Sequence, residues 1–387
     1  MSGDAGLPAV AFVAALGGLP DMGPGRLRAV LALGEPAEVW DRVRRGAVPA
    51  GPTGPAGPGD PRPRPEVAER FGAVVAAWVE AARTVEPAAV WDAHRQAGVG
   101  IAVHGHAAYP AAFVDDPAPP PVLFWLGDAD AVVGTRVAVV GTRRCTAYGR
   151  EVAQELGADL SRAGVAIVSG LALGVDAAAH RGALAVDGAP PIAVVGSGLD
   201  VVYPRRNREL WAAVAERGVV FSEYPLGTPP HPWRFPSRNR LVAALGDALV
   251  VVESRATGGS MHTVREAERR SRPVLAVPGP VRSAASAGTN QLLSEGVAVA
   301  RDATDVLVRM GLESVHARSA AERRPPPSTL GERVLDAVGW QPTTLEQVVV
   351  RTGLALTDAV VALDDLVRDG WVDESGGWFE RAAKPGG

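Results

Sequence analysis

Six short apolar runs alternate with longer amphipathic segments between residues 88 and 310. The runs are rich in valine and do not alternate apolar with polar positions, which is the pattern of strands buried on both faces of a parallel sheet. Between the first two runs, Val152, Leu156 and Leu160 recur at four-residue spacing and form one apolar helix face. The pattern therefore predicts a βαβ series and an α/β fold with a doubly wound parallel sheet. The runs are RVAVVG (136–141), VAIVSG (165–170), IAVVGSG (192–198), VVFSE (219–223), ALVVVES (248–254) and PVLAVPG (273–279).

The segments on either side of this core have different patterns. The first 47 residues predict short helices around a tight turn that contains Pro20, Gly23 and Gly25, either a helix-hairpin-helix or a plain helical turn. The last ordered segment predicts three helices and a hairpin that turns at Ser375, the order of a winged helix. The predicted divisions are a helical domain (1–47), a Pro/Gly-rich linker or insert (48–66), a connecting helix (67–87), the α/β core (88–310), a linker (311–328) and the winged helix (329–382).

Composition limits the class of protein. A chain of 387 residues that is 47% hydrophobic can bury a large core in two or three domains. It has no apolar run of roughly 18 to 20 residues and no basic start typical of a signal peptide, so we expect a cytoplasmic protein. Cys145 is the single cysteine, which excludes an internal disulfide and a zinc site built on paired cysteines; we expect no metal and no cofactor.

Charge is distributed unevenly along the chain. Residues 205–272 contain 12 arginines against 7 carboxylates, a balance of +5, although the whole chain carries −4. A basic segment inside an acidic protein predicts a local anion-binding surface.

Small polar residues, glycines and cations follow the ends of the predicted strands. The carboxyl ends of parallel strands meet at one edge of a sheet, where helix amino termini offer unpaired N–H groups, and glycine lets the backbone approach a phosphate closely. Neither a G-x-G-x-x-G fingerprint nor a P-loop lysine is present, which disfavours a simple NAD or ATP site. The candidate residues in these loops are Gly141, Thr142, Arg143, Ser169, Gly170, Tyr203, Arg205, Asn207, Gly259 and Ser260.

The stretch RFPSRNR (234–240) places Arg238, Asn239 and Arg240 before an apolar run. We expect a loop at the same edge, with guanidinium groups directed at a phosphate backbone and Phe235 or Trp233 as an anchor or a stacking surface.

Four ionisable residues of the predicted strands and helices each have a structural and a catalytic interpretation. Glu223 and Glu253 end neighbouring strands, and we expect them to orient the arginines of 234–240 rather than to act as a catalytic pair. Asp176 and His180 lie four residues apart on a predicted helix, and we interpret them as a hydrogen-bonding pair at its amino terminus rather than as a metal or acid–base pair.

The motifs VAVVGTR, IVSGLALGVDAAAH, AVVGSGLDVVYPRRN, SEYPLG, FPSRNRLVAAL and RPVLAVPG resemble, in order and spacing, the DNA-processing protein A family, also called DprA or Smf. The resemblance implies an extended Rossmann-like core, a sterile-alpha-motif-like amino-terminal domain and a homodimer that binds single-stranded DNA. It also implies loading of the RecA recombinase during natural transformation or recombination, without an enzymatic activity. By matching position it assigns to the nucleic-acid groove Arg143, Ser169, Gly170, Arg205, Asn207, Arg238, Asn239 and Arg240.

Two other functions come from different classes. A phosphoribohydrolase of the LOG type would need a P-G-G-x-G-T-x-x-E loop, but TGGSMHTVREAE lacks that order and Glu266 is its nearest carboxylate. A sequence-specific regulator would use the third helix of the winged helix, which carries four aspartates against Arg368 alone and should be repelled by phosphate.

Overall fold

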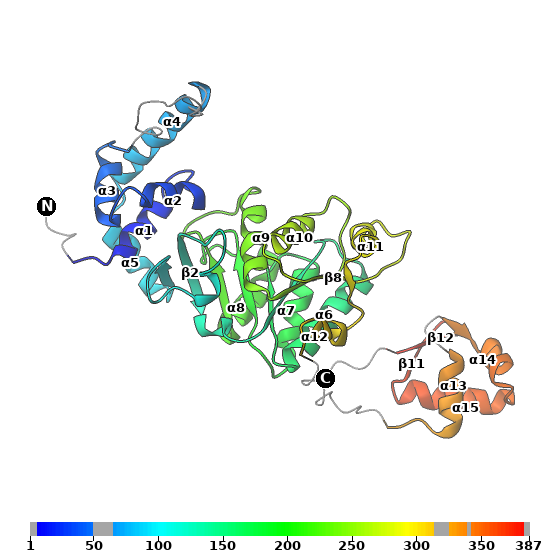
Figure 1. Cartoon of the computed structure of the whole chain (residues 1–387). Helices are drawn as coiled ribbons and strands as arrows, with labels where there is room; N and C mark the ends of the chain where they lie inside the picture. The colour runs from blue at the N-terminus through cyan, green and yellow to red at the C-terminus, as the bar shows by residue number, and fades with distance from the viewer. Residues whose placement is uncertain (1–5, 49–64, 313–324, 339–341, 383–387) are drawn as a thin grey trace. The chain divides into compact units, whose positions relative to one another are not determined.

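The chain folds into two compact units, Met1–Glu313 and Ser314–Gly387, which we call the core unit and the C-terminal unit. A computed structural model describes residues 6–48, 65–312, 325–338 and 342–382 (Figure 1). Each described helix falls short of the length and apolar character needed to cross a membrane.

The core unit contains a nine-stranded sheet in the order β1-β2-β6-β5-β4-β3-β7-β8-β9. The strands from β6 to β9 are parallel, whereas β2 pairs antiparallel with β6 and β1 pairs antiparallel with β2. The six predicted strands are all present. The strands are β1 (Gly100–Val103), β2 (Val122–Gly127), β3 (Arg136–Val140), β4 (Ala166–Ser169), β5 (Ile192–Val195), β6 (Val219–Ser222), β7 (Ala248–Val251), β8 (Val274–Ala276) and β9 (Ala298–Val299).

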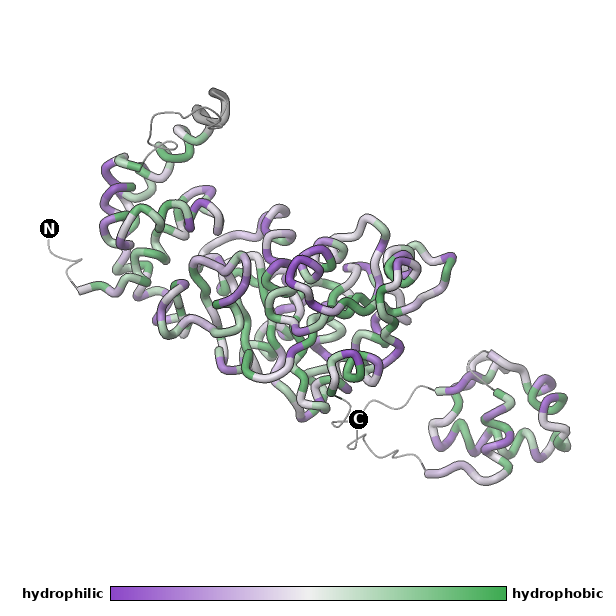
Figure 2. The backbone as a smooth tube through the Cα atoms, viewed as in Figure 1, coloured by the Kyte–Doolittle hydropathy of each residue, from purple (hydrophilic) through white to green (hydrophobic). Residues whose placement is uncertain are grey.

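Helices cover both faces of this sheet, which explains why its central strands are continuously apolar. Val137 and Val139 of β3 pack with α6, α7 and α12, whereas Ala138 and Val140 of the same strand pack with α9 and α10. Alternate side chains therefore enter two different hydrophobic cores, and the strands are mostly green in Figure 2. The helices are α6 (Ala147–Arg162), α7 (Val175–Leu184), α8 (Arg208–Arg217), α9 (Arg234–Leu245), α10 (Ser260–Glu268), α11 (Ala287–Ser294) and α12 (Ala303–Arg309), with short 3₁₀ turns η1 (Ala111–Phe113), η2 (Ala129–Val132) and η3 (Arg205–Asn207).

The amino-terminal segment is helical, as predicted, and packs on the sheet. Phe12 and Leu16 of α1 share one hydrophobic cluster with Val195 and Val220 of the strands, and Trp78 of α4 is fully buried in it. Gly25 lies inside α2 rather than in the predicted turn, since Gly23 caps that helix. The helices are α1 (Ala9–Gly17), α2 (Pro24–Leu31), α3 (Pro36–Arg44), α4 (Pro65–Ala82) and α5 (Pro87–Gln96).

The C-terminal unit has three helices and a three-stranded antiparallel sheet in the order β10-β12-β11. Its own hydrophobic core includes Val334, Val348, Leu363 and Val372. The predicted turn at Ser375 joins β11 to β12. The elements are α13 (Thr329–Val338), β10 (Thr343–Thr344), α14 (Leu345–Thr352), α15 (Leu356–Arg368), β11 (Val372–Ser375) and β12 (Trp378–Arg381).

Two expectations about the core need correction. The sheet is mostly rather than entirely parallel, because the apolar run VLFWLG forms β2 and pairs antiparallel with β6. The stretch 234–240 is not a loop but the first two turns of α9, whose apolar residues from Leu241 to Leu245 continue the helix into the core. The continuous apolar run, which is buried on all sides of the helix, rather than the charge of its first turns, decides how this segment packs.

Two glycines allow α6 and α7 to pack in backbone contact. A Cβ at Gly157 would collide with the carbonyl oxygen of Ala179, and one at Gly182 would collide with the carbonyl oxygen of Gln154. Backbone atoms of a packed helix cannot move aside as a flexible side chain can, so a side chain at either position would force the helices apart.

We therefore expect Gly157→Ala to lower the free energy of unfolding by about 1 to 3 kcal/mol, the usual cost of overpacking a core. Gly72→Ala in α4 is the matched control, because no atom lies within 4 Å of its added Cβ. Alanine is favoured over glycine by roughly 0.5 to 1 kcal/mol inside a helix, so the control should gain stability. Urea unfolding measures both; equal stabilities of Gly157→Ala and the native chain would contradict the close packing.

Candidate nucleic-acid interface

The strand order creates a switch point between β3 and β7. The helix that follows β3 covers one face of the sheet and the helix that follows β7 covers the other, so their connecting loops part at the carboxyl edge. Such a crevice is where open α/β sheets bind ligands. The loops predicted to carry the site meet at this edge.

Gly141 and Thr142 form the first of these loops, directly after β3. The Thr142 N–H donates to the carbonyl oxygen of Glu253, 2.7 Å away, which ties this loop to the end of β7. A Cβ on Gly141 would lie 2.8 Å from the same oxygen and would collide with Val175, so only glycine fits. Arg143 follows with an exposed side chain.

Glu253 supports α6 rather than the arginines of 234–240, which corrects one prediction. Its buried carboxylate accepts hydrogen bonds from the Thr146 N–H at 2.9 Å and the Thr146 hydroxyl at 2.7 Å. The Thr146 oxygen in turn accepts from the Gly149 N–H and caps α6. The carboxylate therefore orders the first turn of the helix that begins beside Arg143.

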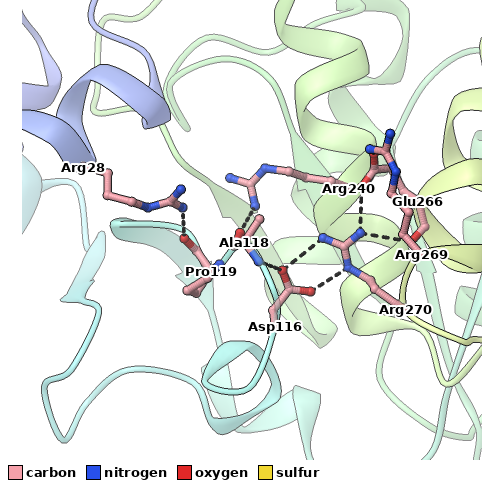
Figure 3. Close-up of polar contacts among 8 residues, drawn as sticks. All are labelled: Arg28, Asp116, Ala118, Pro119, Arg240, Glu266, Arg269 and Arg270. Carbon is pink, nitrogen blue, oxygen red and sulfur yellow. Dashed lines mark hydrogen bonds and ion pairs between the residues drawn. The ribbon is translucent and has the colours of Figure 1, made fainter. Parts of the chain in front are cut away.

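Glu223 does contact the arginine stretch, as predicted. Its carboxylate forms a buried ion pair with Arg240, whose guanidinium also donates to the Ala118 carbonyl oxygen at 2.6 Å (Figure 3). Burial raises the pKa of Glu223 to about 7, and the charge of Arg240 opposes that rise. The two groups that bind the Arg240 guanidinium, the Glu223 carboxylate and the Ala118 carbonyl oxygen, belong to other segments of the core unit. This side chain therefore holds β6, α9 and the segment before β2 together.

Arg238 also lies inside the protein and is only 5% exposed. Its guanidinium donates to the Val194 carbonyl oxygen at the end of β5 and occupies the space that a side chain at Gly170 would need. Its charge also acts on the buried carboxyl of Asp176, whose pKa burial raises and Arg238 lowers.

Asp176 and His180 both lie in α7 and both are buried, but they do not form the predicted hydrogen-bonding pair, because neither ring nitrogen of His180 has a hydrogen-bond partner among the described residues. The Asp176 carboxylate accepts a hydrogen bond from the Gly170 N–H at 3.2 Å and so acts at the helix amino terminus. Burial, together with the charge of Arg238, lowers the pKa of His180 to about 3. Within the described residues, no group of three or more His, Cys, Asp or Glu side chains is placed to hold a metal ion.

Three other predicted site residues have buried side chains with internal partners. The Ser169 hydroxyl donates to the Val139 carbonyl oxygen at 2.7 Å, and the Asn207 amide donates to the Leu171 carbonyl oxygen at 2.9 Å. The Ser260 hydroxyl donates to that of Ser254 at 2.7 Å. These side chains shape the loops from within.

A group of one exposed cation, one exposed aromatic ring and one half-buried aromatic ring is the most ligand-like feature of this edge. The Arg143 guanidinium lies over the Phe235 ring, 4.8 Å from its centroid, and the centroids of Phe235 and Tyr203 are 5.5 Å apart. Tyr203 is 43% exposed. We call Arg143, Phe235 and Tyr203 the edge cluster.

Several polar groups at the same edge are accessible. Arg205 in η3 is exposed, and so is Gly259, which caps α10. The half-buried Asn239 amide donates to the Gly259 carbonyl oxygen at 3.4 Å. Arg255, an exposed cation, was not among the residues predicted for the site; its position directly after the run ALVVVES (248–254) was the available signal.

The carboxylate that a LOG-type enzyme would need is engaged elsewhere. Glu266 accepts hydrogen bonds from Arg269 and Arg270, both at 2.7 Å, near the carboxyl end of α10 (Figure 3). That end of the helix points away from the edge at which α10 begins. Arg270 is held in addition by Asp116, at 2.6 and 3.0 Å.

We expect His180 to make the core unit acid-sensitive. The unfolded chain takes up a proton near pH 6.5, whereas the folded protein excludes it until about pH 3, so stability falls as pH falls through this window. Relative to His180→Leu, which cannot titrate, the native chain should lose about 1.4 kcal/mol per pH unit below pH 6.5. Chemical unfolding of both proteins at several pH values, from about 7 down to about 4, measures this difference, since the pKa of an ordinary histidine is about 6.5. If the free energies of unfolding of the two proteins changed with pH in parallel, the expected effect of His180 would be ruled out.

We expect Arg240→Ala to destabilise the fold, because it leaves the Glu223 carboxylate buried and unpaired. At a pH where Glu223 is ionised, breaking such a buried pair costs about 3 to 5 kcal/mol. The double variant Glu223→Gln/Arg240→Met removes both charges and should recover most of the loss. A single variant that unfolds like the native chain but has lost a ligand would show that Arg240 faces the ligand instead.

Comparison with known proteins places this chain among proteins of DNA recombination. Residues 100–311 match the family described as DNA recombination-mediator protein A. The putative DNA processing protein DprA of Mycobacterium tuberculosis is 42% identical over 245 residues, which cover 61% of this chain and 62% of that protein's length. Protein Smf of Escherichia coli is 34% identical over 275 residues, which cover 69% of this chain and 71% of that protein.

Two solved structures are also similar. DNA processing protein A of Streptococcus pneumoniae has a TM-score of 0.60 at 28% identity, over 78% of this chain and 98% of that one. DNA processing protein A of Helicobacter pylori, described for its single-stranded DNA binding mode, has a TM-score of 0.50 at 31% identity, over 55% of this chain and 95% of that one.

Proposed function

This chain belongs to the DNA recombination-mediator protein A family, also called DprA or Smf, and from that membership we propose that it binds single-stranded DNA at the carboxyl edge of its sheet. The observation that carries this proposal is the edge cluster. An exposed guanidinium can neutralise a phosphate, and aromatic rings beside it can stack on a base without selecting its identity. A site that binds single-stranded DNA without sequence preference needs both a cation and an aromatic surface.

The glycine loops support the same function because they place little side-chain bulk at the carboxyl edge of the sheet. Gly141 and Thr142 lie beside the start of α6, and Gly259 lies at the start of α10. Helix amino termini favour anions, and loops without large side chains let a phosphate approach. The buried residues Ser169, Asn207 and Arg238 would act indirectly by holding these loops.

We further propose the finer features that accompany this family membership. The chain would act as a homodimer in the cytoplasm and would protect incoming or processed DNA, load RecA onto it and serve natural transformation or recombination, without catalysis. The C-terminal unit has the element order of a winged helix, and the amino-terminal helices, which pack on the sheet within the core unit, would be of the sterile-alpha-motif or helix-hairpin-helix type.

The experiment is a binding titration of oligonucleotides with the native chain and Arg143→Ala. The native chain should prefer single-stranded over duplex DNA of any sequence, with affinity that falls as salt rises. Arg143→Ala should weaken binding by about 1 to 3 kcal/mol for all sequences and make the log–log salt slope shallower by roughly 0.7, the contribution of one phosphate contact.

The matched control is Arg162→Ala, at the opposite end of α6. It removes the same charge at the far end of the helix that follows Arg143 and should leave affinity and salt slope unchanged. Equal affinity for single-stranded and duplex DNA, or equal effects of the two substitutions, would contradict the proposed site. Thermal unfolding of both variants shows that the fold is retained.

A further inference from the structure

Helix α15 of the C-terminal unit has an outer face that the unit's own core does not use. Its inner face contributes Ala359, Ala362, Leu363 and Leu366 to the core shared with α13 and α14. On the outer face, Leu356 is 58% exposed, Val360 44% and Val361 59%. In Figure 2 green and purple stretches alternate along this helix, because apolar and charged residues alternate in its sequence.

These exposed apolar residues are neighbours on the helix surface. Leu356 and Val360 are four residues apart and therefore lie one above the other. Val361 follows Val360 directly and lies about 100° further round the helix, so the three side chains span about 140° of its exposed side. Scattered single apolar residues on a surface are ordinary, but one partner segment laid along the exposed side of α15 could cover these three together, and we call them the apolar patch.

Carboxylates surround the patch. Asp358 lies three residues before Val361, Asp364 lies four residues after Val360 and Asp365 lies four residues after Val361, so each shares a helical row with an apolar residue. Arg368 forms an ion pair with Asp365 and lies 3.9 Å from Asp364, beyond the apolar patch.

The charge of the C-terminal unit repels nucleic acid. Residues 325–382 contain 4 arginines and 10 carboxylates, a balance of −6. The hairpin of β11 and β12 follows the same pattern, since Trp378 is exposed between acidic residues such as Glu374 and Glu380. A polyanion that approached α15 would meet this negative field, so phosphate is disfavoured as the ligand of this face.

We propose that the outer face of α15 binds a partner protein through a segment whose apolar side chains are flanked by lysine or arginine. The apolar centre supplies the area that favours association, and the aspartates around it select positive charge and exclude negative charge. A helix presenting anchors at i, i+3 or i+4 has the spacing to match Leu356 and Val360. The C-terminal unit is thereby a protein-binding module attached to a DNA-binding core.

The test uses the full chain and three synthetic peptides of about 18 residues, or five helical turns. The first has a leucine and valine stripe flanked by lysine and arginine; the second replaces the stripe with serine; the third replaces the basic residues with glutamate. Fluorescence anisotropy at about 0.15 M salt, where exposed charges are partly screened, measures the affinity. The first peptide should bind at least roughly tenfold more tightly than the other two, because it alone matches both the apolar and the charged groups.

Substitutions on the chain locate the binding face. Binding of the first peptide should be roughly tenfold weaker in each of two variants. These are the double variant Val360→Ser/Val361→Ser and the triple variant Asp358→Asn/Asp364→Asn/Asp365→Asn. The controls are Val281→Ser, at a valine of the core unit that is 90% exposed, and Asp187→Asn/Glu268→Gln on exposed core carboxylates; both should bind like the native chain. Circular dichroism shows that each variant is folded, and single-stranded DNA affinity should be unchanged in all of them.

Four outcomes would overturn the proposal. The α15 variants could bind the first peptide like the native chain, or the serine peptide could bind as tightly as the first, which would indicate charge attraction alone. Sedimentation could show that Val360→Ser/Val361→Ser changes the oligomeric state, which would make a second copy of this chain the occupant. Loss of duplex DNA binding in the α15 variants would identify nucleic acid instead.

Discussion

One buried carboxylate connects the two loops that separate at the switch point of the sheet. The backbone of Glu253 accepts the Thr142 N–H, and its side chain accepts two hydrogen bonds from Thr146. Neighbouring parallel strands that send their helices to opposite faces leave a crevice between them, and polar backbone groups exposed there need partners. Glu253 accepts hydrogen bonds from the backbone N–H groups of the first loop on the side that faces the protein interior. The solvent-facing side of the loop, including Arg143, is thereby left open to a ligand.

Arginine has two separate uses in this core. Arg238 and Arg240 are largely buried. Arg238 donates to the Val194 carbonyl oxygen, and Arg240 binds the Ala118 carbonyl oxygen and the Glu223 carboxylate. A planar guanidinium with five donors can connect several strands and loops at once, which lysine cannot do. Arg143 instead extends over Phe235 into solvent. The enclosed arginines hold the loops in position, and the exposed one remains available to phosphate.

The two units contain segments of opposite charge. The basic segment 205–272 lies within the core unit, whereas residues 325–382 are strongly acidic. An acidic module tethered to a basic surface would compete weakly with a polyanion for that surface. The same module would attract basic proteins. The two proposals therefore assign DNA to the core unit and a basic protein segment to the C-terminal unit.

The sequence determined six strands of the nine-stranded sheet, their parallel pairing and the edge at which the loops gather. Continuous valine-rich runs require burial on both faces, and parallel strands place all their carboxyl ends together. It also indicated that Glu223 meets the arginines and that Asp176 and His180 are structural. These conclusions depend on periodicity and composition, which are local properties of the chain.

Only the tertiary structure decided which charged side chains are open to solvent. RFPSRNR reads as one basic cluster, yet successive side chains of a helix point in different directions, so Arg238 turns into the sheet while Phe235 meets Arg143 and Tyr203 from two other loops. The antiparallel addition of β2 and the engagement of Glu253 by Thr146 also join residues about 100 positions apart. Such pairings depend on how distant segments pack, and no window of sequence contains both partners.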